Sequence, residues 1–298
     1  MLKEQLNISG QKALELGAEA VEIIRAGGYE APSGRWVDLS GKIQRAVMGT
    51  ESYPPDRPAR WDPAFRGGTA AGLPRVEGFR PAGGFFGEPG SPAAVENETT
   101  LSAGRRLLAE GLNPVALNFA SAVEPGGGFL RGARAQEEYL ARSSALYACL
   151  EGNPMYPFHR EAWDPLYTDY VIYSPEVPFF RDDRGELLEA PCTLGILTSP
   201  AVNAHDLPEE REDEIEDAMR GRIRKVLAVG LKHGHDAIVL GAWGCGAFGN
   251  DARTMAGLFR EQICGDFRGA YRRIVFAIAD WSREERFIGP FRKVLGEG

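Results

Sequence analysis

Helix-like and strand-like patterns of apolar residues follow one another along most of the chain. Apolar positions recur at helical spacing over residues 12–26, and Gly27 and Gly28 end that segment. Patterning and composition predict further helices over residues 39–47, 99–110, 136–150, 206–229 and 252–262. Short apolar runs predict strands over residues 93–96, 115–119, 170–173, 193–198, 237–243 and 273–279. Because strand and helix alternate from residue 93 onward, we predict an α/β layered fold.

Residues 53–92 differ in composition from the rest of the chain. They include proline-rich and glycine-rich stretches such as PPDRPARWDP and PAGGFFGEPGSP. Proline and glycine interrupt regular elements, so this region is predicted to be rich in loops. It separates the amino-terminal helices from the alternating part of the chain.

Three consecutive glycines, Gly126, Gly127 and Gly128, stand between a predicted strand and a predicted helix. Glycine lets the backbone approach a ligand closely, and free N–H groups at a helix start favour an anion. A phosphate or pyrophosphate is therefore the expected ligand. The residues Gln136, Glu137 and Glu138 fall in the first turn of the helix, where acidic groups beside a bound nucleotide suggest catalysis.

A second glycine loop, GCGAFGN, follows the apolar run 237–243. It consists of Gly244, Cys245, Gly246, Ala247, Phe248, Gly249 and Asn250. Its GxGxxG spacing also occurs in dinucleotide-binding folds, in which Asp280 could serve as the ribose-binding acid. Only 18 residues follow Asp280, whereas a dinucleotide fold needs several more strands after this loop. We therefore favour the alternative that both glycine loops close on one nucleotide diphosphate.

The overall composition argues against nucleic acid, membranes and metal ions as partners. The formal charge of −8 disfavours a protein that coats nucleic acid, because such binding needs a dense Lys and Arg surface. No segment is apolar enough to span a membrane, and the amino terminus has no signal-peptide core. The four cysteines form no CxxC pair, and the pair His233 and His235 has no ligand partner at metal spacing. We predict a cytoplasmic protein without metal, cofactor, nucleic-acid or membrane partner.

The stretch NFASAVEPGGGFLRGARAQEE resembles the GGG-spacer-QEE signature of bacterial-type poly(ADP-ribose) glycohydrolases. GCGAFGN is similar to the phosphate-binding loop of the macrodomain fold on which that family is built. The resemblance extends to VENETT and LTSPAVN, and the segments RAGGY and TESYPP resemble the family's amino-terminal accessory segment. It implies a macrodomain-like three-layer α/β/α fold with a mixed central sheet. The expected division is a helical and loop-rich accessory segment over residues 1–75 and a catalytic domain over residues 76–298.

The resemblance also implies an activity and its principal residues. The enzyme would hydrolyse the ribose–ribose bond of poly(ADP-ribose), mainly from chain ends, and release ADP-ribose. Glu138 would protonate the leaving ribose hydroxyl and then activate a water molecule, while Glu137 and Asn118 would bind ribose hydroxyls. Cleavage of an acetal needs such a proton donor and an activated water. Because a general acid must carry a proton, we expect activity to fall at high pH.

The other predicted site residues bind the rest of the substrate. Backbone N–H groups of both glycine loops would surround the diphosphate, and Phe248 would cover the reacting ribose. Glu98 and Thr99 occupy the place at which macrodomains contact the adenine amino group. The substrate partners would be poly(ADP-ribose) and ADP-ribosylated proteins.

Several simpler interpretations stay open at this point. Acidic residues in a first helical turn are commonly surface groups that complement the helix dipole. Phe248 could be an ordinary packing residue, and Cys245 is expected to pack rather than to react. A non-catalytic ADP-ribose reader would need the loops but not Glu137 and Glu138. An enzyme of the same fold could instead remove single ADP-ribose groups from proteins.

Overall fold

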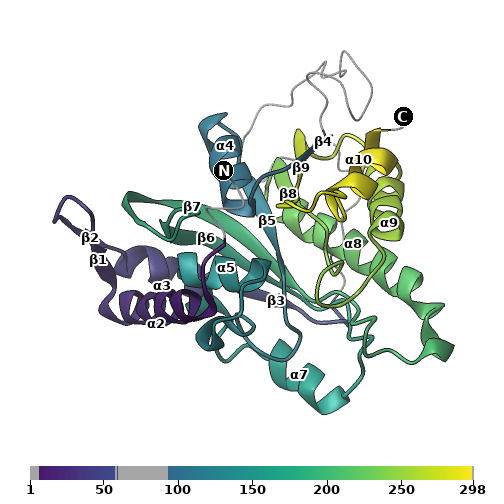
Figure 1. Cartoon of the computed structure of the whole chain (residues 1–298), viewed down its shortest axis with the longest axis horizontal. Helices are drawn as coiled ribbons and strands as arrows, with labels where there is room; N and C mark the ends of the chain where they lie inside the picture. Colours follow the sequence, from purple (N-terminus) through teal and green to yellow (C-terminus); the bar gives the residue numbers. More distant parts are fainter. Residues whose placement is uncertain (1–6, 58, 60–92, 297–298) are drawn as a thin grey trace. The chain divides into compact units, whose positions relative to one another are not determined.

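The computed structural model describes residues 7–57, 59 and 93–296 of the chain (Figure 1). These residues form two compact units, each assembled from separate stretches of sequence. The first unit comprises the described residues within 1–54, 118–164 and 170–200, and the second comprises those within 55–117, 165–169 and 201–298. In the described part of the chain, no helix has the length and apolar character needed to cross a membrane.

The first unit contains helices and antiparallel strands. Its helices are α2 (Gly10–Ala26), α3 (Ser40–Met48), α5 (Gln136–Ser143), α6 (Leu146–Leu150) and α7 (Met155–Ala162), with a short 3₁₀ turn η2 (Phe129–Arg131). Strand β1 (Gly28–Glu30) pairs with β2 (Trp36–Asp38). Strand β6 (Val171–Arg181) pairs on one side with β3 (Glu51–Tyr53) and on the other with β7 (Leu187–Ser199).

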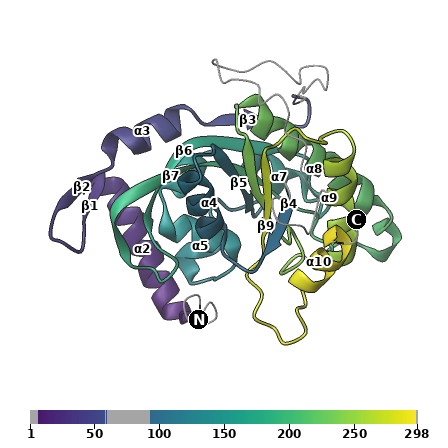
Figure 2. The same cartoon turned by 90° about the horizontal axis from the view of Figure 1, so that it is seen from above.

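Helix α2 ends where the sequence predicts and begins two residues earlier than predicted, at Gly10. Ser9 caps its amino terminus by accepting a hydrogen bond from the backbone N–H of Lys12 at 3.0 Å, and Gly27 ends it in the left-handed conformation. Figures 1 and 2 both show α2 beside α5. The approach is close at Gly17, because a Cβ atom there would lie 2.6 Å from the carbonyl oxygen of Phe129.

The second unit is built around parallel strands. Strand β5 (Pro114–Phe119) pairs with β8 (Ala237–Leu240), β8 pairs with β9 (Arg273–Ala277), and β9 pairs with β4 (Ala93–Glu96). Its helices are α4 (Thr100–Ala109), α8 (Glu214–Lys232), α9 (Ala252–Cys264) and α10 (Ile288–Gly296), with the 3₁₀ turn η3 (Glu209–Arg211). The prediction of an α/β fold that mixes parallel and antiparallel strands is confirmed.

An aromatic cluster in the core of the second unit includes the residue that directly precedes the second glycine loop. Trp243, which directly precedes Gly244, is fully buried and lies against Phe259 of α9. Phe259 in turn contacts Phe276 of β9 at 5.2 Å between ring centroids and Phe291 of α10 at 6.5 Å. Buried aromatic rings contribute much of the packing free energy of a core. The chain therefore enters the loop from a rigid position.

Some predicted boundaries are wrong. The helix predicted over residues 136–150 is two helices, because Ser144 is extended and bridges to Phe179 of β6. The helix predicted over 206–229 begins only at Glu214, after the 3₁₀ turn. The strands predicted over 170–173 and 193–198 are parts of a longer hairpin of 11 and 13 residues, and the run 237–243 leaves the strand after Leu240. The sequence patterns also missed β1, β2, β3, α7 and α10.

Candidate active site

Both predicted acids lie in the first turn of α5, in the first unit. The helix begins at Gln136, whose side-chain oxygen accepts a hydrogen bond from the backbone N–H of Phe119 at 2.9 Å. This bond ties the start of α5 to the end of β5. Glu137 is 3% exposed and Glu138 is 9% exposed. Carboxylates are rarely buried to this degree without a specific role, so these two are not surface groups that complement the helix dipole.

Glu137 is held by three hydrogen-bond donors. Its Oε1 accepts from the Asn118 side-chain amide at 3.3 Å, and its Oε2 accepts from the backbone N–H of Ser121 at 2.6 Å. The backbone N–H of Gly126 is the third donor. Burial raises the pKa of Glu137 well above its ordinary value, although these hydrogen bonds oppose the shift, while the nearby charge of Glu138 adds to it. The carboxyl group is thus fixed in orientation.

Glu138 is held at one oxygen only. Its Oε1 accepts a hydrogen bond from the backbone N–H of Gly128 at 2.9 Å. Its Oε2 is buried and has no hydrogen-bond partner among the residues that the structure describes. An ionised carboxylate accepts at both oxygens, and a protonated one can donate from one of them. Oε2 of Glu138 is therefore the atom available to give a proton to a bound substrate or to take one from it.

The triple glycine brings the backbone against both acids. Gly127 has a φ of 59°, in the left-handed region, and a Cβ atom there would lie 2.4 Å from Oε1 of Glu138 and 2.9 Å from Oε2 of Glu137. Only glycine fits such a position without strain. The N–H groups of Gly126 and Gly128 donate to Glu137 and Glu138, and that of Gly127 donates to the carbonyl of Glu124 at 3.0 Å.

These contacts give the first glycine loop a role in orienting the acids. The prediction that its N–H groups surround a diphosphate stays a prediction, and it would require them to exchange their present acceptors. Among the predicted residues, the structure brings together Asn118, Gly126, Gly127, Gly128, Gln136, Glu137 and Glu138.

The second glycine loop, in the second unit, presents backbone N–H groups that are not used internally. Within the described residues, those of Gly246, Ala247 and Phe248 donate to no acceptor. The side chain of Asn250 closes the loop by donating to the carbonyl oxygens of Val202 at 2.7 Å and Gly244 at 3.1 Å. Gly244 and Gly249 both have positive φ. Successive unpaired N–H groups in such a turn are suited to an anion.

Two side chains of this loop have defined surroundings. The ring of Phe248 lies 6.2 Å from that of Tyr167, and its carbonyl oxygen accepts from the backbone N–H of His205. Whether Phe248 covers a ribose stays a prediction. Cys245 is buried, and burial raises the pKa of its thiol to about 12. The thiol is therefore protonated at neutral pH and packs rather than reacts.

Glu98 and Thr99 have structural contacts at the start of α4. Thr99 caps the helix by accepting from the backbone N–H of Ser102 at 2.9 Å. Glu98 forms an ion pair with Arg106 at 2.5 Å. Their predicted contact with adenine stays a prediction.

Asp280 does not serve as a ribose-binding acid. Its Oδ1 accepts from the backbone N–H and the hydroxyl of Ser282, and its Oδ2 accepts from the backbone N–H groups of Phe287 and Ile288. These bonds occupy both oxygens and tie β9 to the start of α10. The chain after β9 adds only α10 among the described residues. The dinucleotide-binding alternative therefore has neither its acid nor its later strands.

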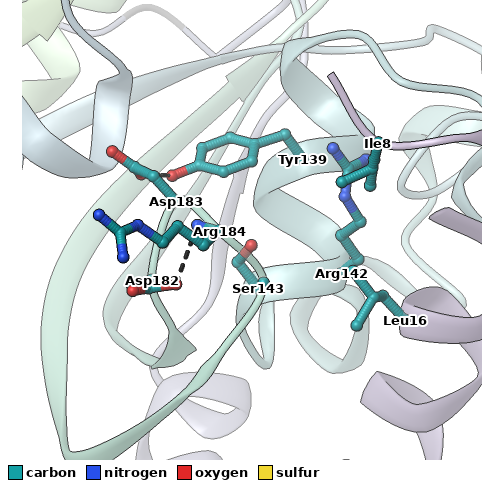
Figure 3. A pocket seen from close by; sticks show the side chains of 9 residues that line it. Ile8, Leu16, Tyr139, Arg142, Ser143, Asp182, Asp183 and Arg184 are labelled. Atoms are coloured by element: carbon teal, nitrogen blue, oxygen red, sulfur yellow. Dashed lines mark hydrogen bonds between the residues drawn. The ribbon is translucent and has the colours of Figure 1, made fainter. Parts of the chain in front are cut away.

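Another face of α5 anchors the helix to the rest of the first unit. Figure 3 shows Tyr139 pointing toward the turn between β6 and β7, where its hydroxyl donates to Asp183. Arg142 is 4% exposed, and its guanidinium lies against the Tyr139 ring. Burial lowers the pKa of Arg142, while Tyr139 and Glu138 act against that shift. The hollow beside these residues measures only about 10 Å³, room for one water molecule, so it belongs to the packing of the helix.

Residues 17–182 match the family described as microbial-type PARG, catalytic domain. A comparison with curated protein sequences gives no match. Among solved structures, poly(ADP-ribose) glycohydrolase from Thermomonospora curvata bound to the inhibitor ADP-HPD is 43% identical, with a TM-score of 0.82 over 95% of this chain and 99% of that chain.

A second relative was solved with ADP-ribose. Poly(ADP-ribose) glycohydrolase from Deinococcus radiodurans in complex with ADP-ribose is 37% identical, with a TM-score of 0.74 over 87% of this chain and 98% of that chain. The second glycine loop lies outside residues 17–182, but the comparison with the Thermomonospora structure covers nearly the whole chain. The predicted fold is confirmed by these similarities. By sequence and by fold, the chain belongs to the microbial-type poly(ADP-ribose) glycohydrolases.

Proposed function

We propose that this chain hydrolyses the ribose–ribose O-glycosidic bond of poly(ADP-ribose) and releases ADP-ribose, with Glu138 as both acid and base. The observation that carries this assignment is the unequal occupation of the Glu138 carboxyl group. One oxygen is fixed by Gly128, and the other is buried and without a partner in the described structure. A group so arranged can exchange a proton with a ligand without losing its position.

The reaction follows from this arrangement. Oε2 of Glu138 gives its proton to the bridging oxygen as the bond from that oxygen to the anomeric carbon breaks, which leaves an oxocarbenium-like sugar. The resulting carboxylate takes a proton from a water molecule whose oxygen then bonds to the anomeric carbon. Each cycle consumes one water and restores the proton on Glu138.

Glu137 is proposed to position the sugar. A carboxylate has about four lone-pair sites, and three N–H donors already occupy Glu137. Roughly one site is left for a ribose hydroxyl. Of the two acids, only Glu138 has a carboxyl oxygen without a hydrogen-bond partner in the described structure, because both oxygens of Glu137 accept from N–H groups. Glu138 is therefore proposed to carry the proton transfer alone.

The second glycine loop is proposed to bind the diphosphate. The N–H groups of Gly246, Ala247 and Phe248 supply donors without any basic side chain. Such binding suits a chain with a formal charge of −8. Action mainly at chain ends, poly(ADP-ribose) and ADP-ribosylated proteins as the substrate partners, and a cytoplasmic location complete the proposal. The predicted division at residues 75 and 76 lies outside the described residues and stays a prediction.

Replacement of Glu138 tests the assignment. The Glu138→Gln variant should release ADP-ribose from poly(ADP-ribose) at least about 1,000-fold more slowly, the range expected for a lost general acid, and should still bind ADP-ribose. Release is measured by chromatography and binding by calorimetry. The matched control is Glu124→Gln, a half-exposed loop carboxylate paired with Arg131, which should keep wild-type activity.

An assay with two substrates distinguishes polymer hydrolysis from removal of single ADP-ribose groups and from binding without catalysis. The wild-type protein is incubated with poly(ADP-ribose) and, separately, with a protein that carries single ADP-ribose groups. Release from the polymer alone supports the proposal. Release from the singly modified protein alone would indicate the mono-ADP-ribosyl hydrolase, and release from neither would indicate a non-catalytic reader.

A further inference from the structure

The first unit contains buried polar atoms for which the structure describes no hydrogen-bond partner. Two belong to residues already discussed, Oδ1 of Asn118 and Oε2 of Glu138. A third is the hydroxyl of Tyr156, on α7, whose side chain is 2% exposed. Buried polar groups in folded proteins are nearly always paired, so an unpaired group calls for an explanation.

Helix α7 lies against the loop that carries the three glycines. The Arg160 guanidinium, one turn after Tyr156, donates to the carbonyl oxygen of Val123 at 2.6 Å. Val123 precedes the glycines by three positions. Residues four apart in a helix share a face, so Tyr156 is on the side of α7 that meets this loop.

The Tyr156 hydroxyl is also close enough to Glu137 for the charge of that carboxylate to affect the pKa of the hydroxyl. Burial raises the pKa of Tyr156 well above its ordinary value, and the Glu137 carboxylate raises it further. The hydroxyl does not, however, hydrogen-bond to Glu137, whose donors in the described structure are Asn118, Ser121 and Gly126. It is thus a neutral group near Glu137, with an unused donor and an unused acceptor in the described structure.

A phenylalanine would fill the same volume without burying an unpaired hydroxyl. Packing of the free protein therefore does not account for the oxygen. A ribose ring carries vicinal hydroxyls, each of which both donates and accepts, and so can pair with a tyrosine hydroxyl.

We propose that the Tyr156 hydroxyl is a substrate-binding group that pairs with a hydroxyl of the ribose held by Glu137. This inference rests on the proposed function and adds a residue of α7 to the site. The ligand class is a furanose with free hydroxyls, attached to a nucleoside diphosphate. Tyr156, Asn118 and Glu137 then contact one sugar from three separate elements, α7, β5 and α5.

The Tyr156→Phe variant tests this inference, because it removes one oxygen and keeps the ring. Calorimetry is done with ADP-ribose and with ADP. Because ADP lacks the distal ribose, an effect of the substitution on that sugar changes the affinity for ADP-ribose but not the affinity for ADP. Affinity for ADP-ribose should fall about fivefold, the usual effect of one neutral hydrogen bond, while affinity for ADP should stay at the wild-type value. The Tm of the ligand-free variant should be equal to or higher than that of the wild type.

Tyr271→Phe is the matched control. Tyr271 is also buried, but its hydroxyl donates to the carbonyl oxygen of Leu227 at 2.7 Å. Its removal should lower the Tm and leave both affinities unchanged. If Tyr156→Phe behaves in this way, its hydroxyl has a structural role and the inference is wrong. Equal losses for ADP-ribose and ADP would overturn it as well.

Failure of the proposed function would look different. A wild-type protein that releases no ADP-ribose from the polymer would refute the glycohydrolase assignment. The comparison of ADP-ribose with ADP would still report whether Tyr156 contacts the distal ribose.

Discussion

Two neighbouring carboxylates at residues 137 and 138 share a helical turn but differ in their surroundings. Glu137 accepts three N–H groups, whereas Glu138 accepts one and keeps Oε2 without a partner in the described structure. The sequence predicted both acids, because QEE after three glycines is a specific pattern. It could not predict the donors, since backbone N–H groups such as that of Ser121 are common to every residue except proline. The sequence does not single out Tyr156, the residue of the further proposal, because a single tyrosine in a helix has no distinguishing signal.

The burial of Glu137 leads to a prediction about pH. Folding raises the pKa of this group above its ordinary value of 4.5, so the folded state holds more protons than the unfolded state between those two values. The free energy of unfolding should therefore fall as pH rises from about 4.5 through that window. Glu137→Gln cannot titrate and should show a shallower fall, as measured by urea unfolding at several pH values. The slope is the test, and a variant with the wild-type slope would contradict the prediction.

Among the elements, those set by local pattern were predicted well and those set by distant partners were not. Helix α2 follows its apolar spacing and its caps. The break between α5 and α6 depends on Ser144, which pairs with Phe179, a residue far along the chain. Local patterns do not contain such pairings, and tertiary contacts override helix propensity. For the same reason the long hairpin of β6 and β7 was only partly predicted.

The loop before α5 should not tolerate a side chain at its middle glycine. In Gly127→Ala the new Cβ would overlap with Oε1 of Glu138, which must then move. A displacement of about 1 Å can reduce turnover about 100-fold, and we expect at least that loss in polymer hydrolysis.

Gly111→Ala is the control for backbone strain. Gly111 also has positive φ, but no heavy atom lies within 4 Å of a Cβ atom placed there. Alanine at positive φ costs both variants a similar backbone strain of about 1 kcal/mol. A difference in activity between them therefore measures the effect of displacing the carboxylates. Equal activities would show that the acids tolerate the displacement.

In the molecule as a whole, each compact unit combines segments that are far apart in the sequence. The amino-terminal helix α2 belongs to the unit that contains both acids. Its Gly17 lies directly against Phe129, which follows the three glycines. The amino-terminal segment is thus part of the support of the proposed catalytic loop. The pattern of elements predicted the fold class but not this grouping, because the grouping depends on contacts between distant segments.

The contact at Gly17 can be tested by adding one methyl group. Alanine normally favours a helix interior over glycine, yet Gly17→Ala should destabilise the protein by about 1–3 kcal/mol, because its Cβ would overlap with a backbone oxygen. Gly257→Ala, in α9 with open space around it, should instead stabilise by about 0.5–1 kcal/mol. Urea unfolding measures both, and the opposite signs are the expected result.

The discontinuous make-up of the first unit has a consequence for synthesis on the ribosome. This unit is complete only when residue 200 of 298 has been translated. Tyr29 and Phe180 belong to one buried cluster. Tyr29 therefore cannot be buried in this cluster as in the folded protein until Phe180 has been synthesised. At roughly 5–20 residues per second, this delay lasts on the order of ten seconds or more. During that interval Ala20 and Ile23 of α2 lack the apolar neighbours Ala145 and Phe180 that bury them in the folded protein.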